Sequence, residues 1–186
     1  MVNQKHHGHG DNVNVEGDAH FYAIQKYPSI LAEIINELGK CLFLPEQGES
    51  DLQGEFVIAD KIKHNNIVKY KGVIEEHRIY QGKLNAIYGE LDSQASSKKL
   101  ILLRNVRNSY LKIKGSYIAK SPTTNLIDTI RTNSDKIIED IEKELLGEID
   151  KSNNIAAPLE TVKIALLIIM VDAFMRCKIL ENPEDE

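Results

Sequence analysis

Histidines near the N-terminus are the first residues whose type and spacing could do chemistry. His6, His7, His9 and Asp11 lie within one short stretch, and imidazole is a good ligand for transition metals. A structural zinc site, however, needs four ligands that a fold holds in a tetrahedral arrangement, whereas glycines separate these histidines. We therefore expect adventitious metal binding at most, and we predict neither a metal site nor a cofactor.

Two further histidines, His64 and His77, could serve as a general base. Helical-bundle ribonucleases of the HEPN type carry an arginine a few residues before the catalytic histidine, but Lys71, Gly72 and Val73 stand before His77, and no arginine precedes His64. The phosphate loop GxxxxGK[ST] and the motifs GxSxG, HExxH and CxxC do not occur either. The sequence therefore predicts a protein that is not an enzyme.

One carboxylate has a partner at helical spacing. Asp172 and Arg176 are four residues apart in an apolar stretch, so a helix would place them on the same face. A buried carboxylate must be paired, since otherwise its pKa rises and it becomes neutral. We predict a structural ion pair that fixes helix packing, and recognition of a partner or ligand at a helix interface is the alternative.

The elements that would position these residues are helical. The strongest pattern is a seam of apolar residues and tyrosines at alternating spacings of 3 and 4 between residues 60 and 119, which is typical of packed helices. Its members are Tyr70, Val73, His77, Tyr80, Leu84, Ile87 and Leu91, followed by Leu103, Val106, Tyr110, Ile113 and Tyr117. We expect one helix from about Asp60 to about Ser93 and a second that returns antiparallel to it, with each tyrosine ring packed and its hydroxyl at the edge.

The remaining patterns complete an all-α fold of about five helices. Residues 1–26 read as a flexible leader rich in Gly, His, Asn and Asp, and residues 27–186 as a single helical domain. Within it, residues 27–39 form the first helix, 60–119 the basic helical hairpin and 123–180 the C-terminal helices. The last of these, from Leu159 to Leu180, is apolar nearly all round, so we expect it to be the central core helix.

Charge is segregated along the chain. The whole chain carries a net charge of −5, but residues 60–121 carry +8 while the segments before and after carry −6 and −7. The basic residues scatter around the hairpin, whereas a nucleic-acid surface would gather them on one side with aromatics between them. We expect attraction to acidic protein surfaces, including the acidic helix near residues 139–148, and no membrane contact. The longest apolar run, 164–171, spans only about 12 Å as a helix.

Two parts of the chain resemble proteins of bacterial conflict systems. Residues 6–18 are similar to the GxGDNVxGD leaders of such proteins. The chain from Asp60 on is similar to a domain of the ABC-three-component defence systems, which are related to Lamassu-type anti-phage loci. The segments that carry this resemblance are 61–62, 65–66, 80–84, 87–88, 102–107, 110–115 and 171–180.

The resemblance implies a system rather than a reaction. In such systems an SMC-like ATPase controls an effector through small connecting domains, and this sequence carries no fused nuclease or other effector domain. We therefore expect a cytoplasmic, non-enzymatic adaptor whose partners are the SMC-like ATPase and the effector. The residues assigned to partner binding are Lys61, Asn65, Asn66, Arg104, Arg107 and Lys114.

Two other interpretations remain open from the sequence. The first is a nucleic-acid-binding sensor or small nuclease that uses the basic hairpin. The second is a homo-oligomer assembled through the heptad seams.

Overall fold

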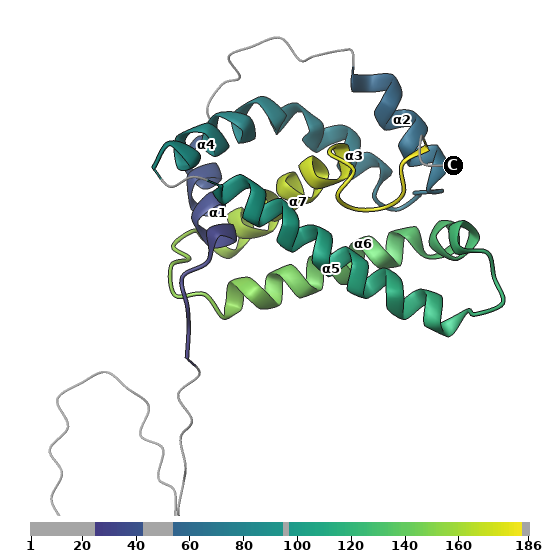
Figure 1. The fold of residues 1–186 in the computed structure, drawn as a ribbon. Coiled ribbons are helices and arrows are strands. Elements are labelled where there is room, and N and C mark those ends of the chain that lie inside the picture. Colours follow the sequence, from purple (N-terminus) through teal and green to yellow (C-terminus); the bar gives the residue numbers. More distant parts are fainter. Residues whose placement is uncertain (1–24, 43–53, 95–96, 184–186) are drawn as a thin grey trace, which may run out of the picture.

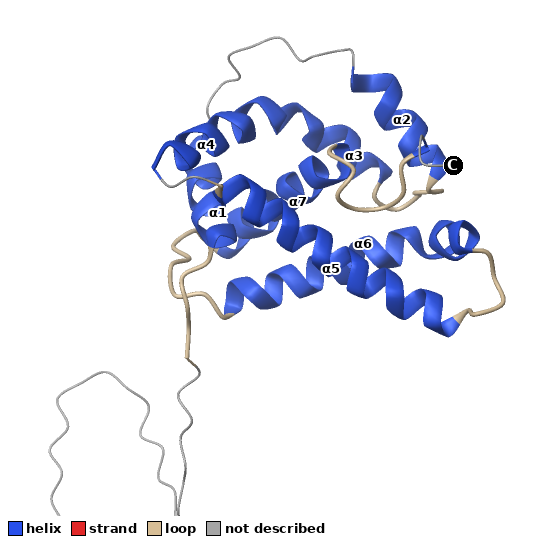
Figure 2. Ribbon diagram, viewed as in Figure 1, coloured by secondary structure: helices blue, strands red, loops and turns tan. Residues whose placement is uncertain are grey.

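The computed structural model describes residues 25–42, 54–94 and 97–183, and within these ranges every regular element is a helix (Figure 2). The predicted leader lies outside the described residues except for its last two. The helices are α1 (Ile30–Cys41), α2 (Gly54–His64), α3 (Lys71–His77), the 3-10 turn η1 (Arg78–Tyr80), α4 (Gln81–Gln94), α5 (Lys98–Lys120), α6 (Leu126–Asp150) and α7 (Leu159–Met175). The all-α prediction is confirmed.

The helices pack around α7, which contacts α1, α3, α4, α5 and α6 (Figure 1). Its buried residues occupy all sides of the helix and run from Val162 to Phe174, because this segment has too few polar residues to offer a face to water. The predicted central core helix is therefore present. It ends at Met175 rather than at Leu180, since Cys177 and Leu180 adopt positive φ angles of 55° and 60° that no α-helix allows.

Helices α5 and α6 form the most extensive helix pair (Figure 1). The apolar residues of α6 recur every three or four positions and are buried, and Asn125 caps the helix by accepting a hydrogen bond from the Ile127 amide at 3.2 Å. On α5, Leu103, Val106 and Tyr110 of the predicted seam are buried in the same core. Helices α4 and α5 also pack together, but α5 has its larger contact with α6.

The single helix expected from Asp60 to Ser93 is wrong. The chain leaves the helix after His64, turns through residues 65–70 and resumes as α3, η1 and α4. Asn66 has a φ of 53°, which asparagine tolerates better than most residues. The Asp135 carboxylate on α6 accepts hydrogen bonds from the amides of residues 68, 69 and 70 at 3.0–3.3 Å. It thus satisfies donors that a continuous helix would have bonded internally.

The first helix also differs slightly from its predicted bounds. Ser29 is its N-cap, so Pro28 precedes the helix and does not lie in its first turn. Gly39 lies inside α1 and marks the close approach of two helices. A Cβ atom at this position would stand 2.8 Å from Cγ2 of Thr161 on α7.

Candidate functional site

The residues that follow α7 return along the molecule as an irregular stretch, residues 176–183, which we call the C-terminal segment. The Asn65 side chain bonds both backbone groups of one residue in this segment, Glu181. Its amide nitrogen donates to the Glu181 carbonyl at 2.8 Å, and its carbonyl oxygen accepts from the Glu181 amide at 3.0 Å. Ile179 and Leu180 are buried in the core. The C-terminal segment is therefore built into the fold.

The Glu181 side chain ties the same segment to α5. Its carboxylate accepts hydrogen bonds from the Tyr110 hydroxyl and from Lys114 Nζ, the latter at 2.6 Å. Burial alone would raise the pKa of Glu181, but the hydrogen bonds from Lys114 and Tyr110 outweigh it and lower that pKa below its usual value. Burial and the same bond raise the pKa of Tyr110. Glu181 therefore stays ionised in the folded protein.

Lys61 lies at the point where α7 ends. Its side chain is 2% exposed, and its ammonium donates to the Phe174 carbonyl at 2.5 Å and lies 4.4 Å from the centroid of the Phe174 ring. Burial lowers the pKa of Lys61. The negative end of the α7 dipole and the ring face compensate part of that cost. Lys61 is thus a capping group for α7.

Four of the six residues predicted to bind a partner contact the chain's own C-terminal region. Lys61 and Asn65 are buried, so their assignment to direct partner contact is corrected: in this conformation a partner cannot reach them. Arg107 donates to the Lys178 carbonyl at 3.3 Å, and Lys114 binds Glu181. These residues gather because they hold residues 174–181 in place.

The other two predicted residues, Asn66 and Arg104, have exposed side chains. The Asn66 carbonyl accepts a hydrogen bond from Ser134 Oγ at 3.2 Å, so its backbone is anchored to α6. The Arg104 side chain leaves α5 on the side away from α6 and makes no ion pair with the described residues. The structure therefore does not bring the six residues together in one surface.

Asp172 and Arg176 form an ion pair at the contact between α7 and α4, and the Asp172 carboxylate is buried. Arg176 Nε lies 2.9 Å from each carboxylate oxygen of Asp172. The Tyr88 hydroxyl donates to the same carboxylate at 3.1 Å, and Arg176 reaches the Asn85 side chain at 2.5 Å. Burial and then the Asp172 charge raise the pKa of Tyr88, so Tyr88 remains a donor. Arg176 and Tyr88 thus supply the hydrogen bonds that the Asp172 carboxylate, on a residue only 2% exposed, needs in the core.

Three of the four tyrosines of the seam, Tyr70, Tyr110 and Tyr117, pack the ring and donate the hydroxyl to a carboxylate. Tyr70 donates to Glu142 at 2.9 Å, and Tyr117 donates to Asp140 at 2.8 Å. Burial, followed by the Asp140 bond, raises the pKa of Tyr117 to about 12. The segment 60–119 thus donates hydrogen bonds to carboxylates of the acidic helix, and Lys69 Nζ also lies 3.3 Å from the Glu139 carboxylate.

Sequence reasoning missed the acceptors that complete these networks. Asp135 and Glu142 stand on one acidic helix at a spacing of seven residues, which was a visible signal that they face the same neighbour. Glu181 follows the last helix in a short polar stretch, and no local pattern marks it as a partner of Tyr110.

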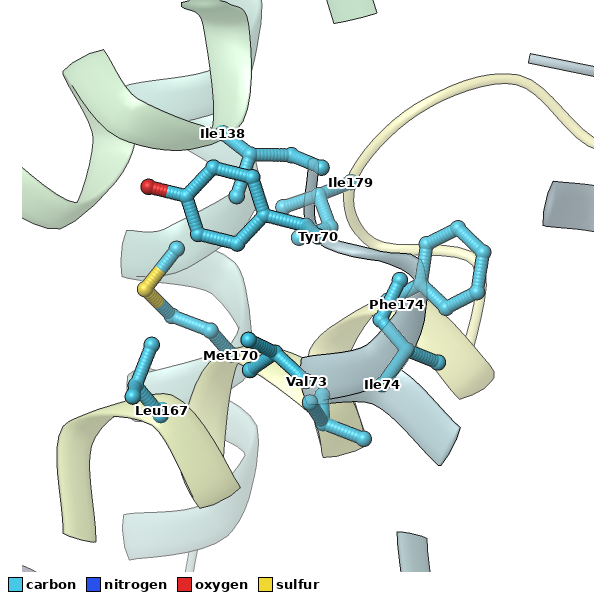
Figure 3. Close-up of a pocket in the computed structure, with 9 residues that line it drawn as sticks. Tyr70, Val73, Ile74, Ile138, Leu167, Met170, Phe174 and Ile179 are labelled. Atoms are coloured by element: carbon cyan, nitrogen blue, oxygen red, sulfur yellow. The ribbon is translucent and has the colours of Figure 1, made fainter. Parts of the chain in front are cut away.

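A cavity lies between α3, α6 and α7, and Figure 3 shows the side chains around it. Tyr70 forms one wall, and its hydroxyl points away from Val73 and Phe174. The lining is otherwise aliphatic or aromatic, with one thioether from Met170. The volume is about 20 Å³, room for about one water molecule, and an apolar space of this size stays dry. It is a packing gap and offers no groups for chemistry.

The described residues contain neither a candidate metal cluster nor a candidate membrane-spanning helix. No group of three or more His, Cys, Asp or Glu side chains there could hold a metal ion, and the cluster at His6, His7, His9 and Asp11 lies outside them. None of the helices in the described ranges is both long enough and apolar enough to cross a membrane.

Comparison with known proteins places the chain by its family. No curated protein and no solved structure matches it significantly. Residues 31–181, from the start of α1 to the glutamate that anchors the C-terminal segment, match the model of C-terminal domain 10 of the ABC-three component (ABC-3C) systems. This range contains every helix described above apart from Ile30, the first residue of α1, and so the chain belongs to the family of ABC-three-component C-terminal domain 10.

Proposed function

We propose that this chain is a non-enzymatic adaptor, or accessory subunit, of a bacterial anti-phage ABC-three-component system, and that it docks the SMC-like ATPase or the effector of that system. The observation that carries the proposal is the family match over residues 31–181. A system of several components works only if its components contact one another. A domain whose matched range is the whole helical body must make such contacts through its helical surface.

The use of the titratable groups supports docking rather than catalysis. Asp172 is paired with Arg176, Glu181 with Lys114 and Tyr110, and Lys61 with the end of α7. Each of these groups serves packing, whereas a catalytic site would direct them toward a shared space for a substrate. The cavity beside Tyr70 is lined by apolar groups and is far too small for a substrate.

Co-expression tests the proposal. The full chain with an affinity tag would be produced together with the SMC-like ATPase and, separately, with the effector of the same system. Each mixture would be analysed by size-exclusion chromatography with light scattering. We expect one stable complex that contains both chains. If the chain elutes at its own mass of 21.0 kDa in the presence of each component, the adaptor function is wrong. A multiple of this mass for the chain alone would reveal a homo-oligomer.

A nucleic-acid-binding function is the second candidate, because α5 carries seven basic residues and no acidic one. The aromatic side chains on this helix, however, are committed: Tyr110 and Tyr117 pack inward and donate to carboxylates. Gel-shift and cleavage assays with DNA and RNA at about 0.15 M salt decide between the two functions. A shift that is lost as salt rises would favour nucleic acid, and unchanged mobility would exclude it.

A further inference from the structure

Helix α5 has an inner and an outer face. The inner face packs on α6 and α7 through Leu102, Leu103, Val106 and Tyr110, which are buried. On the other side of the helix Leu100, Ile101 and Leu111 are 55%, 53% and 45% exposed. We call the outer face the exposed side formed by Leu100, Ile101, Arg104, Leu111 and Lys112. In Figure 1 α5 crosses in front of α6.

The inner face shows which kind of surface this helix binds. Its neighbour α6 combines buried isoleucines with eight acidic and three basic residues. Asn105 donates to Glu148 at 2.7 Å, and Ser109 donates to Glu144 at 3.1 Å. An acidic amphipathic helix is therefore the ligand that the inner face of α5 already accommodates.

The outer face combines aliphatic groups with positive charge. Three large aliphatic side chains lie beside two cations, and no acidic residue occurs anywhere on α5. Arg104 makes no ion pair with the described residues. Lys112 is 75% exposed at its side chain, and its only ion pair in the described part of the chain is a 3.9 Å approach to Glu144. Exposed aliphatic groups beside two cations, one without an ion pair and one with only a long contact, are typical of a protein-docking surface.

We propose that the outer face of α5 binds an acidic amphipathic helix of a partner protein. The aliphatic residues would receive its apolar stripe, and Arg104 and Lys112 would pair with the carboxylates that flank that stripe. This inference rests on the proposed function, because it requires that the chain docks a protein.

Other occupants fit this face less well. A second copy joined through the same face would bring Arg104 and Lys112 against their own counterparts, with no acid on α5 to offset the repulsion. Nucleic acid would gain nothing from Leu100, Ile101 and Leu111 and would find few free cations. Residues 1–24 of this chain hold three acidic residues, and between positions 3 and 22 their aliphatic residues are Val13, Val15 and Ala19. These three are too few and too irregularly spaced to form the apolar stripe of an amphipathic helix.

The test uses two substitutions in the full chain and two matched controls. Arg104→Glu reverses a charge on the outer face, and Leu111→Gln removes an aliphatic group while keeping a good helix former. Lys136→Glu on α6 and Leu159→Gln on α7 make the same chemical changes at exposed positions elsewhere. Each protein would be titrated with the component that co-purifies with the wild type, at about 0.1 M and 0.5 M salt, and its helix content and melting temperature would be recorded.

We expect each outer-face substitution to weaken binding at least tenfold, as a central interface residue does, while both controls bind like the wild type. The loss for Arg104→Glu should be larger at low salt, because it adds repulsion to a charge pair. Binding by Arg104→Glu and Leu111→Gln at wild-type strength would overturn the outer-face proposal and leave the adaptor function standing. A chain that binds neither component would remove both. A mass of the chain alone that is twice 21.0 kDa would also overturn the proposal, in favour of self-association. A gel shift of DNA or RNA that Arg104→Glu abolishes would overturn it in favour of nucleic-acid binding.

Discussion

Asn65 is a fully buried side chain whose hydrogen-bonding groups serve distant parts of the backbone. Replacing it by Ala removes both bonds to the Glu181 backbone and the bond to the Lys61 carbonyl. A buried group left without a partner costs about 1–3 kcal/mol. We therefore expect Asn65→Ala to lower the free energy of unfolding by about 2 kcal/mol or more in urea denaturation. Asn108→Ala, at an exposed position of α5, should cost nothing; equal losses in both variants would contradict this role of Asn65.

Glu181 makes the free energy of unfolding depend on pH, in a direction that follows from its lowered pKa. Its pKa is lower in the folded state than in the unfolded chain. Its ionised form therefore adds stability above the unfolded pKa, and this contribution disappears as pH falls through the folded value. We expect Glu181→Gln to be less stable than the wild type at pH 7, and the gap to close as pH is lowered from about 5 to about 3. Urea denaturation at each pH measures the gap.

The control for this pH prediction is Glu76→Gln, which removes an exposed carboxylate from α3. Its stability relative to the wild type should stay the same across that range. If the difference in free energy of unfolding between Glu181→Gln and the wild type does not change with pH, the charge of Glu181 does not contribute to stability.

At the scale of elements, Asp135 stabilises the turn at residues 65–70, which interrupts the helix expected from Asp60 to Ser93. Its carboxylate accepts from the amides of Val68, Lys69 and Tyr70, and hydrogen bonds to charged groups are stronger than neutral ones. Asp135→Ala should lower stability by about 1–3 kcal/mol and should speed hydrogen exchange at these three amides at least tenfold. Glu76→Ala on α3 should change neither quantity. Unchanged exchange in Asp135→Ala would mean that the turn is fixed by its own sequence.

The turn also shows why local patterns predicted some elements and not others. Helices α5 and α6 could be predicted because their apolar residues recur every three or four positions and both helices bury that stripe. The break after His64 could not, because the carboxylate that satisfies its backbone amides, Asp135, lies 65–67 residues away in the sequence. Asn65 and Asn66 were the only local signal of a break. Asn66 adopts a positive φ, and the Asn65 side chain hydrogen-bonds a backbone amide.

The candidate site was less predictable than the fold for the same reason. The Asp172–Arg176 pair has helical spacing, so the sequence could place the two residues together. The grouping of Asn65 and Lys114 around the C-terminal segment depends on Glu181, which only the folded chain brings to Tyr110. The exposed face of α5 could not be separated from its buried face by charge alone, because Lys114 binds inside the molecule while Arg104 points outward.

At the scale of the whole molecule, one contact reports how closely the first and last helices pack. Gly39 on α1 faces Thr161 on α7, and an added Cβ would come within 2.8 Å of the threonine methyl. Alanine gains about 1 kcal/mol over glycine inside a helix, but overpacking costs about 1–3 kcal/mol. Gly39→Ala alone should therefore be neutral or destabilising.

Thr161→Ser removes that methyl group and makes room for the alanine. We expect the double variant to exceed the stability predicted by adding the two single effects by about 1 kcal/mol, a coupling typical of residues in contact. Gly89→Ala, on α4 with no atom within 4 Å of the added Cβ, should stabilise the protein equally with either residue at 161. Because α7 also carries the C-terminal segment and contacts α5, a Gly39→Ala gain equal to that of Gly89→Ala would show that α1 sits farther from this core helix than the structure places it.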